Sequence, residues 1–529
     1  MNIITIREQP NNTQNEYKVT VTFNNNDEFP SCTITNPFST TQETDLKWYF
    51  DEYVANAENE DKSNQIKADL KKQGIELFDQ VFRDRALMRR YERDKNTGIQ
   101  CIEIIGSPAF HSLHWETLYD AVDSQWLALD IPLIRKYTTP TKVELLESSP
   151  TINLLMVTAR PNRERDINYR AISRHLVESL RQAKLLVNIE MLRPGTRSAL
   201  KKHLATQKKG HYHIIHLDVH GELRENTPLV YLENEQPNHV DLIKAAELAE
   251  LFYQYRIPIV ILNACESGKQ VLSAFETSLS GQLMVAGIPL VLAMRYAVTV
   301  RAATLFMSAL YQHLFDKRND DVVNAIQRAR QNLYDNKKRF DAYHQEFELE
   351  DWIIPVVYQN TQKVSLPLRD FTPEEQAIYY AHKRHYDPNL PYDQFMGRDW
   401  EIYHIEAKLR QHNILLIRGG SGIGKTALLH YLGGWWQATH FINEVFYFGY
   451  DAQTWTQQQI LEGVIQKFNA EMRGTFESLD LEKQLAMVID YLLKNPNLLI
   501  FDALSYLESQ EKPALHDLLA QLVGGKTLI

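Results

Sequence analysis

Two reactive side chains follow two short apolar runs in the middle of the chain. His220 comes after the run at 212–219 (YHIIHLDV), and Cys265 comes after the run at 257–264 (IPIVILNA). Runs of this length, rich in β-branched residues, predict buried strands of a parallel sheet, with a crossing helix at 246–255. Reacting groups collect beyond the carboxyl ends of such strands. We therefore expect the imidazole and the thiol to lie side by side.

A histidine beside a cysteine is suited to acyl transfer. The thiolate is the nucleophile, and an adjacent imidazole takes the thiol proton and later returns it to a leaving amine. A developing oxyanion would be bound by the backbone N–H groups of Gly221 and Cys265. The N–H of Gly221 is accessible because glycine has no side chain to obstruct it. A structural alternative stays open on these residues alone, because free cysteines are often buried and strand-end histidines often serve only packing.

Three segments together resemble the CHAT family of caspase-like peptidases. They are HWETLYD at 114–120, HLDVHG at 216–221, which has the pattern HxxxHG, and LNACESG at 262–268. The resemblance runs from near the N-terminus to about residue 360. It implies an α/β fold, with a caspase-like sheet and flanking helices. It also matches His220 to the catalytic histidine, Cys265 to the nucleophile and Gly221 to an oxyanion-hole glycine.

Such a dyad needs no metal, so the two histidines and the acid of HSLHWETLYD at 111–120 are interpreted as core packing rather than as a metal site. Arg295 follows a predicted strand at 287–294, near the region that lines the specificity pocket of caspase-like folds. A surface ion pair is our preferred interpretation of Arg295, over a contact with an acidic substrate residue. Asp218 would share a strand face with His220 and is a candidate to orient an imidazole. The arginines of 159–172 are interpreted as a solvated helix.

A phosphate-binding loop lies near the C-terminal end of the chain. An apolar run at 413–418 leads into GGSGIGKT at 419–426, which a helical pattern follows. Glycines let backbone N–H groups surround phosphates, Lys425 reaches the terminal phosphates and Thr426 binds Mg²⁺. Asp502 ends the apolar run NLLIFD, where a second Mg²⁺ contact is expected. The sequence therefore predicts ATP and Mg²⁺ as cofactors.

FMGRDWE at 395–401 resembles the linker that contacts adenine in STAND signalling ATPases of the NACHT and NB-ARC type. The resemblance departs in one respect. Such relatives commonly carry an acid shortly after the aspartate, whereas this chain continues Asp502-Ala503-Leu504-Ser505 and offers only Glu508 as a poor substitute. Hydrolysis of ATP and mere binding therefore both stay open. The predicted nucleotide-binding residues are Arg398, Gly419, Gly420, Ser421, Gly422, Ile423, Gly424, Lys425 and Thr426.

The length of 529 residues and a proline-containing segment in the second half of the chain indicate more than one domain. We place a peptidase domain at 1–360, a proline-containing linker at 361–392 and a P-loop NTPase domain at 393–529. The chain stops at KTLI, where another strand is expected to start, so we predict that the NTPase domain is truncated at its C-terminus.

Composition narrows the class of protein and its partners. A formal charge of −10 and a pI near 6 give no reason to expect a nucleic-acid partner. Three cysteines in so long a chain do not form a disulfide framework and favour a reducing cytoplasm. The N-terminus has no signal-peptide pattern, and the most apolar stretch is too short to cross a bilayer, so no membrane partner is expected.

These patterns predict a cysteine endopeptidase that acts on a protein substrate and is regulated by a fused ATP-binding switch, with homo-oligomerisation on activation. Family resemblance implies a role in bacterial antiphage defence or programmed cell death, and a gasdermin-like substrate by analogy only. One alternative is a nucleotide-dependent signalling and oligomerisation scaffold with an inactive peptidase-like domain. Another is an ATPase with a mechanical or regulatory output.

Overall fold

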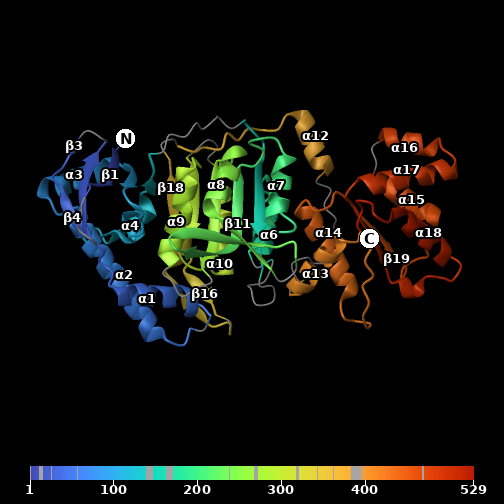
Figure 1. Cartoon of the computed structure of the whole chain (residues 1–529), viewed down its shortest axis with the longest axis horizontal. Helices are drawn as coiled ribbons and strands as arrows, with labels where there is room; N and C mark the ends of the chain where they lie inside the picture. Colours follow the sequence, from blue (N-terminus) through green and yellow to red (C-terminus); the bar gives the residue numbers. More distant parts are fainter. Residues whose placement is uncertain are drawn as a thin grey trace. The chain divides into compact units, whose positions relative to one another are not determined.

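The computed structural model of the chain consists of two compact units, which are described separately (Figure 1). Unit 1 comprises Met1–Asn188 and Leu192–Asp370, and unit 2 comprises Ile189–Met191 and Phe371–Ile529. The structure describes residues 2–10, 16–24, 27–55, 57–138, 147–161, 170, 172–236, 239–266, 272–316, 321–341, 343–360, 363–382, 395, 397–467 and 470–529.

Unit 1 is built on a mixed β-sheet, whose middle strands are those predicted to carry the reactive pair. Strands β9 (Ile152–Thr158), β11 (Ile214–Arg224), β14 (Ile259–Glu266) and β15 (Leu290–Met294) lie next to one another in this order and run parallel. Beyond β15, the antiparallel β18 (Pro355–Gln359) continues the sheet. The predicted fold class, an α/β sheet with flanking helices, is confirmed.

The same sheet extends into the N-terminal region. There β8 (Leu133–Lys136), β5 (Ile99–Ile105) and β1 (Asn2–Glu8) are parallel neighbours, and β2 (Glu16–Phe23) pairs antiparallel with β1. The remaining strands of unit 1, with β10 at its boundary, are β3 (Asp27–Glu28), β4 (Cys32–Thr35), β6 (Tyr119–Asp120), β7 (Gln125–Trp126), β10 (Val187–Met191), β12 (Thr227–Glu233), β13 (Val240–Lys244), β16 (Lys338–Phe340) and β17 (Glu346–Glu348).

Helices surround this sheet and connect its strands (Figure 1). Those of unit 1 are α1 (Thr40–Lys47), η1 (Trp48–Glu52), α2 (Glu60–Val81), α3 (Arg85–Thr97), α4 (Pro108–His111), η2 (Trp115–Thr117), α5 (Leu127–Asp130), α6 (Ser173–Gln182), α7 (Arg197–Ala205), α8 (Ala245–Gln254), α9 (Leu272–Val285), α10 (Val300–Asp316), α11 (Val322–Asp335) and η4 (Asp351–Ile353).

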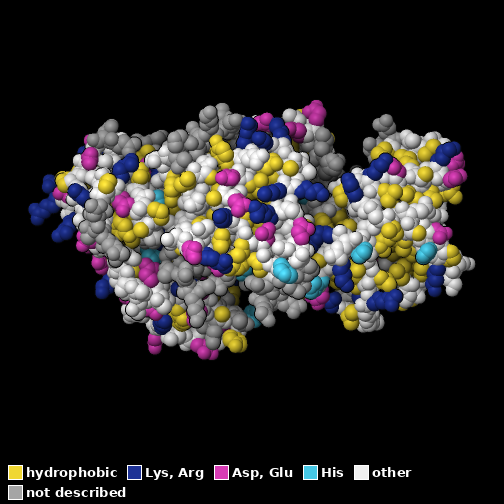
Figure 2. All heavy atoms as spheres, viewed as in Figure 1, with side chains coloured by type: hydrophobic (Ala, Val, Ile, Leu, Met, Phe, Trp, Pro, Cys, Tyr) yellow, Lys and Arg dark blue, Asp and Glu magenta, His cyan; other side chains and the backbone are white. Residues whose placement is uncertain are grey.

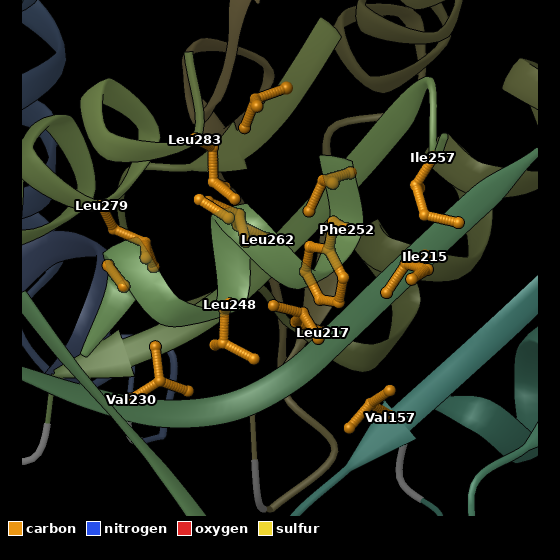
Figure 3. Packing of buried hydrophobic residues seen from close by; sticks show 14 of the residues in the cluster. Val157, Ile215, Leu217, Val230, Leu248, Phe252, Ile257, Leu262, Leu279 and Leu283 are labelled. Carbon is orange, nitrogen blue, oxygen red and sulfur yellow. The ribbon is translucent and has the colours of Figure 1, made fainter. Parts of the chain in front are cut away.

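One side of the middle strands is held by an apolar core. Side chains alternate between the two faces of a strand, so Leu217 of β11 and Leu262 of β14 point to the same face. There they pack with Phe252 of α8 and Leu283 of α9 (Figure 3). Each such side chain contributes roughly 1.5–3 kcal/mol when fully buried. This core fixes the register of β11 against β14, because a one-residue slip would turn its apolar residues to the opposite face.

The connection from β11 to β14 is more elaborate than predicted. We expected one crossing helix, and α8 is that helix. However, β11 does not end near Val219 but continues to Arg224, and the antiparallel strands β12 and β13 precede α8. The parallel pairing and the crossing helix are confirmed, whereas the hairpin was missed.

Unit 2 has a smaller parallel sheet surrounded by helices. Strand β19 (Val445–Gly449) pairs with β20 (Leu498–Asp502), and Leu528 bridges to β20 on its other side. The helical elements of unit 2 are α12 (Pro373–His382), α13 (Asp399–Leu409), α14 (Lys425–Ala438), α15 (Gln457–Ile465), α16 (Ala470–Glu477), α17 (Leu481–Lys494), η6 (Leu504–Tyr506) and α18 (Lys512–Leu522).

The strand predicted at 413–418 is not formed as a regular strand. Asn413 and Leu415 exchange backbone hydrogen bonds with Ile529, at 2.7 and 2.8 Å, and the pairing ends there. The side chain of Leu416 is 58% exposed, so the apolar run is not buried as expected. An apolar run predicts a buried strand only where neighbouring backbone extends alongside it.

Several features bear on other expectations. Val364, Leu366 and Leu368, in the predicted linker, are buried and belong to unit 1, whereas residues 383–394 lie outside the described residues.

Among the described residues, no helix has the length and apolar character needed to cross a bilayer. Lys and Arg side chains are interspersed with Asp and Glu side chains on the face drawn in Figure 2.

Candidate active site and nucleotide site

Strands β11 and β14 place His220 beside Cys265. The two residues are register partners on adjacent parallel strands, and their neighbours Gly221 and Glu266 are the next pair. Residues paired in this way direct their side chains to the same face of a sheet. The backbone of Cys265 is described, but its side chain and residues 267–271 lie outside the described residues. The side-chain geometry of the predicted dyad therefore stays a prediction.

Gly221 lies inside a ladder rather than beyond the end of a strand. β11 continues past His220, and Gly221 is paired with Val230 of β12 on one side and with Glu266 of β14 on the other. The pattern of apolar residues stops at Val219, which is why the strand was expected to end there. The oxyanion-hole assignment of Gly221 and Cys265 stays a prediction.

A buried polar group lies one residue pair before this position. Asp218 and Asn263 are register partners, and the Asn263 amide donates a hydrogen bond of 3.3 Å to Asp218 Oδ1. The other carboxylate oxygen, Asp218 Oδ2, accepts from Arg160 at 2.5 Å. Among the described contacts, the Asp218 carboxylate thus binds an arginine and an amide rather than an imidazole.

Arginines expected at the surface are buried instead. Arg160 and Arg170 are each 1% exposed. The interpretation of 159–172 as a solvated helix is therefore wrong for these two arginines. Residues 162–169 of that segment lie outside the described residues. Arg295 is 2% exposed, and the predicted surface ion pair is wrong. Its guanidinium contacts His114 Nδ1 at 2.9 Å and donates to the carbonyl of Leu113 at 3.3 Å.

His114 in turn connects Arg295 to helix α1. Its Nε2 lies 3.0 Å from the Glu43 carboxylate. Burial alone raises the pKa of Glu43, but the neighbouring His114 outweighs it and lowers the pKa to about 2. The interpretation of the 111–120 segment as packed core is supported, because His111, His114 and Trp115 are all buried.

A second buried ion pair lies close by, between Arg135 of β8 and Glu116. The pair is bidentate, at 2.5 and 2.9 Å. Burial raises the pKa of Glu116, but Arg135 outweighs it and lowers the pKa to about 2. Glu276 on α9 accepts from the hydroxyl of Tyr358 at 3.3 Å, and burial raises its pKa. The Tyr358 contact ties α9 to β18, and β8, which carries Arg135, is the neighbouring strand of the sheet.

Two histidines leading up to the site are buried and electrically neutral at ordinary pH. Burial lowers the pKa of His213 to about 4 and that of His216 to about 4. His213 Nδ1 accepts from the Asn153 backbone N–H at 3.0 Å. Both imidazole rings are therefore uncharged, buried parts of the interior of unit 1.

The phosphate-binding loop of unit 2 adopts a wrapped conformation. Gly422 and Gly424 have φ angles of 77° and 85°, which favour glycine. Lys425, the first residue of α14, folds back over the loop and donates to the carbonyls of Gly419 at 3.0 Å and Gly420 at 2.9 Å. An ammonium group held over a glycine-rich loop at a helix N-terminus is suited to phosphate.

Arg398, one of the predicted nucleotide-binding residues, lies against this loop. It precedes α13 in a left-handed conformation, with φ of 55°, and its guanidinium donates a hydrogen bond to the carbonyl of Ile423. Loop residues 419–423 and Thr426 are exposed or partly exposed. A polyphosphate therefore fits these residues.

Asp502 ends β20 as predicted and is held in place by two donors. Its Oδ1 accepts from the backbone N–H of Ala503 at 2.7 Å, and its Oδ2 accepts from the Tyr447 hydroxyl at 3.1 Å. His430 of α14 lies against Tyr447, with ring centroids 4.3 Å apart. Burial lowers the pKa of His430, and the Asp502 charge opposes that effect.

Sequence reasoning missed Arg160, Tyr447 and His430. His430 follows Thr426 by four residues, a spacing that places both on one helix face, so it was accessible to pattern analysis. Tyr447 alternates with buried Phe446 and Phe448 on β19, and period-2 alternation would have pointed it toward the other face. Arg160 gives no such signal, because its partner Asp218 is 58 residues away.

Two family models match the chain. The CHAT domain model matches residues 72–380, more than half of the chain, and the NACHT domain model matches residues 413–529. None of the curated proteins compared matches the chain. The chain thus joins a caspase-like peptidase fold to a NACHT nucleoside-triphosphatase domain.

Solved structures that are similar to the chain are distant in sequence. Separase from Saccharomyces cerevisiae, in complex with securin, is 11% identical with a TM-score of 0.38, over 68% of this chain and 30% of that chain. Caspase-1 from Spodoptera frugiperda is 14% identical with a TM-score of 0.28, over 46% and 98%. The Arg-specific cysteine proteinase gingipain R is 12% identical with a TM-score of 0.30, over 63% and 77%. The chain therefore spans less than a third of the separase chain.

Proposed function

We propose that this chain, which belongs to the CHAT domain family, is a cysteine endopeptidase whose His220 and Cys265 form the catalytic dyad. The observation that carries the proposal is the register of β11 and β14, which pairs these two residues on adjacent parallel strands. A thiol and an imidazole on one sheet face, where the parallel pairing of β11 with β14 ends, are the groups that acyl transfer requires.

The reaction would proceed in two halves. His220 takes the proton of the Cys265 thiol, and the thiolate attacks the scissile carbonyl to form a thioester while the C–N bond breaks. The imidazolium gives its proton to the leaving amine. Water then attacks the thioester with His220 as base, which releases the carboxylic acid and restores the thiol. Backbone N–H groups of Gly221 and Cys265 are the proposed donors to the oxyanion.

The NACHT unit would bind ATP with Mg²⁺. Gly419 to Gly424 would surround the phosphates, Lys425 would bind the terminal phosphates, and Arg398 would lie beside the nucleotide. Thr426 and Asp502 would hold Mg²⁺, whose charge neutralises the phosphates. The wrapped loop, with Lys425 held over it, supports this assignment.

Nucleotide binding would regulate the peptidase through assembly. A ligand shifts a conformational equilibrium only by as much as its affinities for the two states differ. ATP together with a trigger would favour a homo-oligomer that brings peptidase units together. This arrangement suits a cytoplasmic bacterial defence or cell-death protease that acts on a protein substrate, with a gasdermin-like protein as the analogous substrate.

The dyad is tested by cleavage and by labelling in the full chain. Wild type is incubated with a peptide mixture made from a bacterial proteome, with ATP and Mg²⁺, and new peptide N-termini are counted by mass spectrometry. Iodoacetamide labelling of Cys265 is measured in parallel. We expect new N-termini from wild type only, and slower labelling of Cys265 in His220→Ala.

The controls separate the peptidase from a scaffold. Cys265→Ala removes the nucleophile and should yield no new N-termini, while its nucleotide binding equals that of wild type. Cleavage that persists in Cys265→Ala would refute the dyad. Cys265 that labels at the same rate with and without the His220 ring would favour a signalling scaffold with an inactive peptidase fold.

A further inference from the structure

Strand β11 changes its neighbour on one side just before His220. Up to Asp218 the neighbour is β9, whose Thr158 is the partner of Asp218. From His220 onward the neighbour is β12, through Tyr231. β14 pairs with β11 throughout this stretch. Where a strand exchanges one neighbour for another, its ladder is interrupted, and here the interruption adjoins the proposed base.

Arg160 fills this interruption. It follows β9 by two residues, and its guanidinium donates to the backbone carbonyl of Asp218 at 2.9 Å and of Ala159 at 3.1 Å. The same guanidinium forms the 2.5 Å ion pair with the Asp218 carboxylate. Its backbone N–H lies 3.4 Å from the carboxylate of Glu233 on β12. One side chain therefore joins the end of β9 to β11, and its backbone meets β12.

The contacts continue across the sheet to the strand of the nucleophile. Asp218 Oδ1 accepts from Asn263, which precedes Cys265 by two residues on β14. Arg160, Asp218 and Asn263 are all buried, with at most 6% exposure. Because alternate residues share a face, this row lies directly beneath the register pair of His220 and Cys265.

We propose that Arg160 and Asp218 are positioning residues that fix the backbone of His220 relative to that of Cys265, an inference that rests on the proposed dyad. Replacing a buried ion pair by apolar residues is often neutral or favourable for stability, so fold stability alone is a weak reason for this pair. A dyad, by contrast, is sensitive to small displacements, since a misplacement of about 1 Å can slow a reaction about 100-fold.

The chain contains a matched control for burial and charge. Arg339 of β16 and Asp351 of η4 form a buried pair at 2.6 and 2.7 Å, which involves neither β11 nor β14. Conservative changes in the two pairs, Arg160→Lys and Asp218→Asn against Arg339→Lys and Asp351→Asn, disturb comparable interactions. Asn263→Ala removes only one hydrogen bond and serves if the charged variants fail to fold.

The test measures iodoacetamide alkylation of each cysteine in the full chain by mass spectrometry, together with the melting temperature. We expect Arg160→Lys and Asp218→Asn to slow alkylation of Cys265 by about 10- to 100-fold. The Arg339 and Asp351 variants should lower the melting temperature similarly and leave the Cys265 rate within about twofold. Cys101 is buried and reports general loosening, because its alkylation accelerates only when the core opens.

Two results would overturn the inference, and they are distinguishable. If wild-type Cys265 reacts no faster than Cys265 in His220→Ala, the dyad itself is wrong and the positioning role fails with it. If the reaction depends on His220 but the Arg160, Asp218 and Asn263 variants match wild type, or match the Arg339 and Asp351 controls, the dyad stands and the positioning role is refuted.

Discussion

The hydroxyl of Tyr447 on β19 donates a hydrogen bond of 3.1 Å to Oδ2 of Asp502 on the neighbouring strand β20. The carboxylate is thereby held from one side by a side chain and from the other by the backbone N–H of Ala503. Removing a partner that orients a metal-binding carboxylate typically weakens metal affinity by about 10- to 100-fold.

Tyr447→Phe should therefore weaken Mg²⁺ binding by about 10-fold or more while the phosphate loop stays intact. The Mg²⁺ concentration for half-maximal nucleotide binding, titrated with a fluorescent ATP analogue, measures the effect. Tyr450→Phe is the matched control, because the Tyr450 hydroxyl has no hydrogen-bond partner among the described residues. Equal Mg²⁺ titrations for the two variants would contradict this role.

Lys425→Ala should weaken ATP binding by about 10- to 100-fold, since a charge-assisted contact contributes about 1.5–3 kcal/mol. Isothermal titration with ATP and Mg²⁺ checks the change. Lys494→Ala removes an exposed lysine that pairs with Asp490 and should bind ATP as wild type does. The loop would not be a nucleotide site if both variants bound equally.

The proposed dyad predicts non-additive losses. His220→Ala and the double variant His220→Ala/Cys265→Ala should both reduce peptide cleavage to the background of Cys265→Ala, because the two groups act as one unit. Initial rates on a cleaved peptide found in the proteome mixture provide the measurement. Substantial residual cleavage in His220→Ala, lost in the double variant, would show that Cys265 works with another base.

Regulation by assembly predicts that activity follows oligomer size. Wild type with ATP, Mg²⁺ and its trigger should cleave faster as light scattering reports assembly, and Lys425→Ala should remain small and slow. Monomers that cut as fast as assemblies, with Lys425→Ala equal to wild type, would remove the nucleotide switch from the proposal.

The burial of His216 leads us to expect that the folded state of unit 1 is destabilised by acid. Its pKa of about 4 lies below the ordinary value near 6.5, so the unfolded chain binds a proton that the folded chain excludes. The stability of the folded state is therefore complete above pH 6.5 and falls as the pH drops toward 4. The slope is at most about 1.4 kcal/mol per pH unit for one proton.

Urea unfolding of the full chain at pH 7.5, 6.5, 5.5 and 5 tests this expectation. His216→Leu should flatten the dependence on pH, and the exposed His516, replaced in the same way, is the matched control. An unchanged slope in His216→Leu would mean that His216 is not a source of the acid sensitivity.

Much of the sheet was predictable because its strands carry local patterns. The runs at 99–105 and 151–159 match β5 and β9 within one residue at each end, since a strand buried on both faces is a continuous apolar run. The parallel direction of β11 and β14 was also predictable, from the helix between the two runs, whereas the register that pairs His220 with Cys265 is fixed by the apolar face of these strands.

The buried charges were not predictable, for a physical reason. An isolated arginine is expected at the surface, and only a partner justifies its burial. Arg295 meets His114 across 181 residues and Arg160 meets Asp218 across 58, so no local window contains both members of either pair. The segment at 413–418 failed in the opposite way, because an apolar run does not reveal how much backbone lies beside it.

The two halves of the proposed dyad differ in how firmly the sheet holds them. At His220 the backbone has β12 on one side and β14 on the other, whereas the pairing of β14 with β15 ends at Leu262 and Ala293, before Cys265. We therefore expect amide hydrogen exchange to be slow at 218–222 and faster at 263–266. On assembly with ATP, protection from exchange should increase at 263–266 alone. The backbone of His220 would then stay in place, and the backbone of Cys265 would be the part that moves.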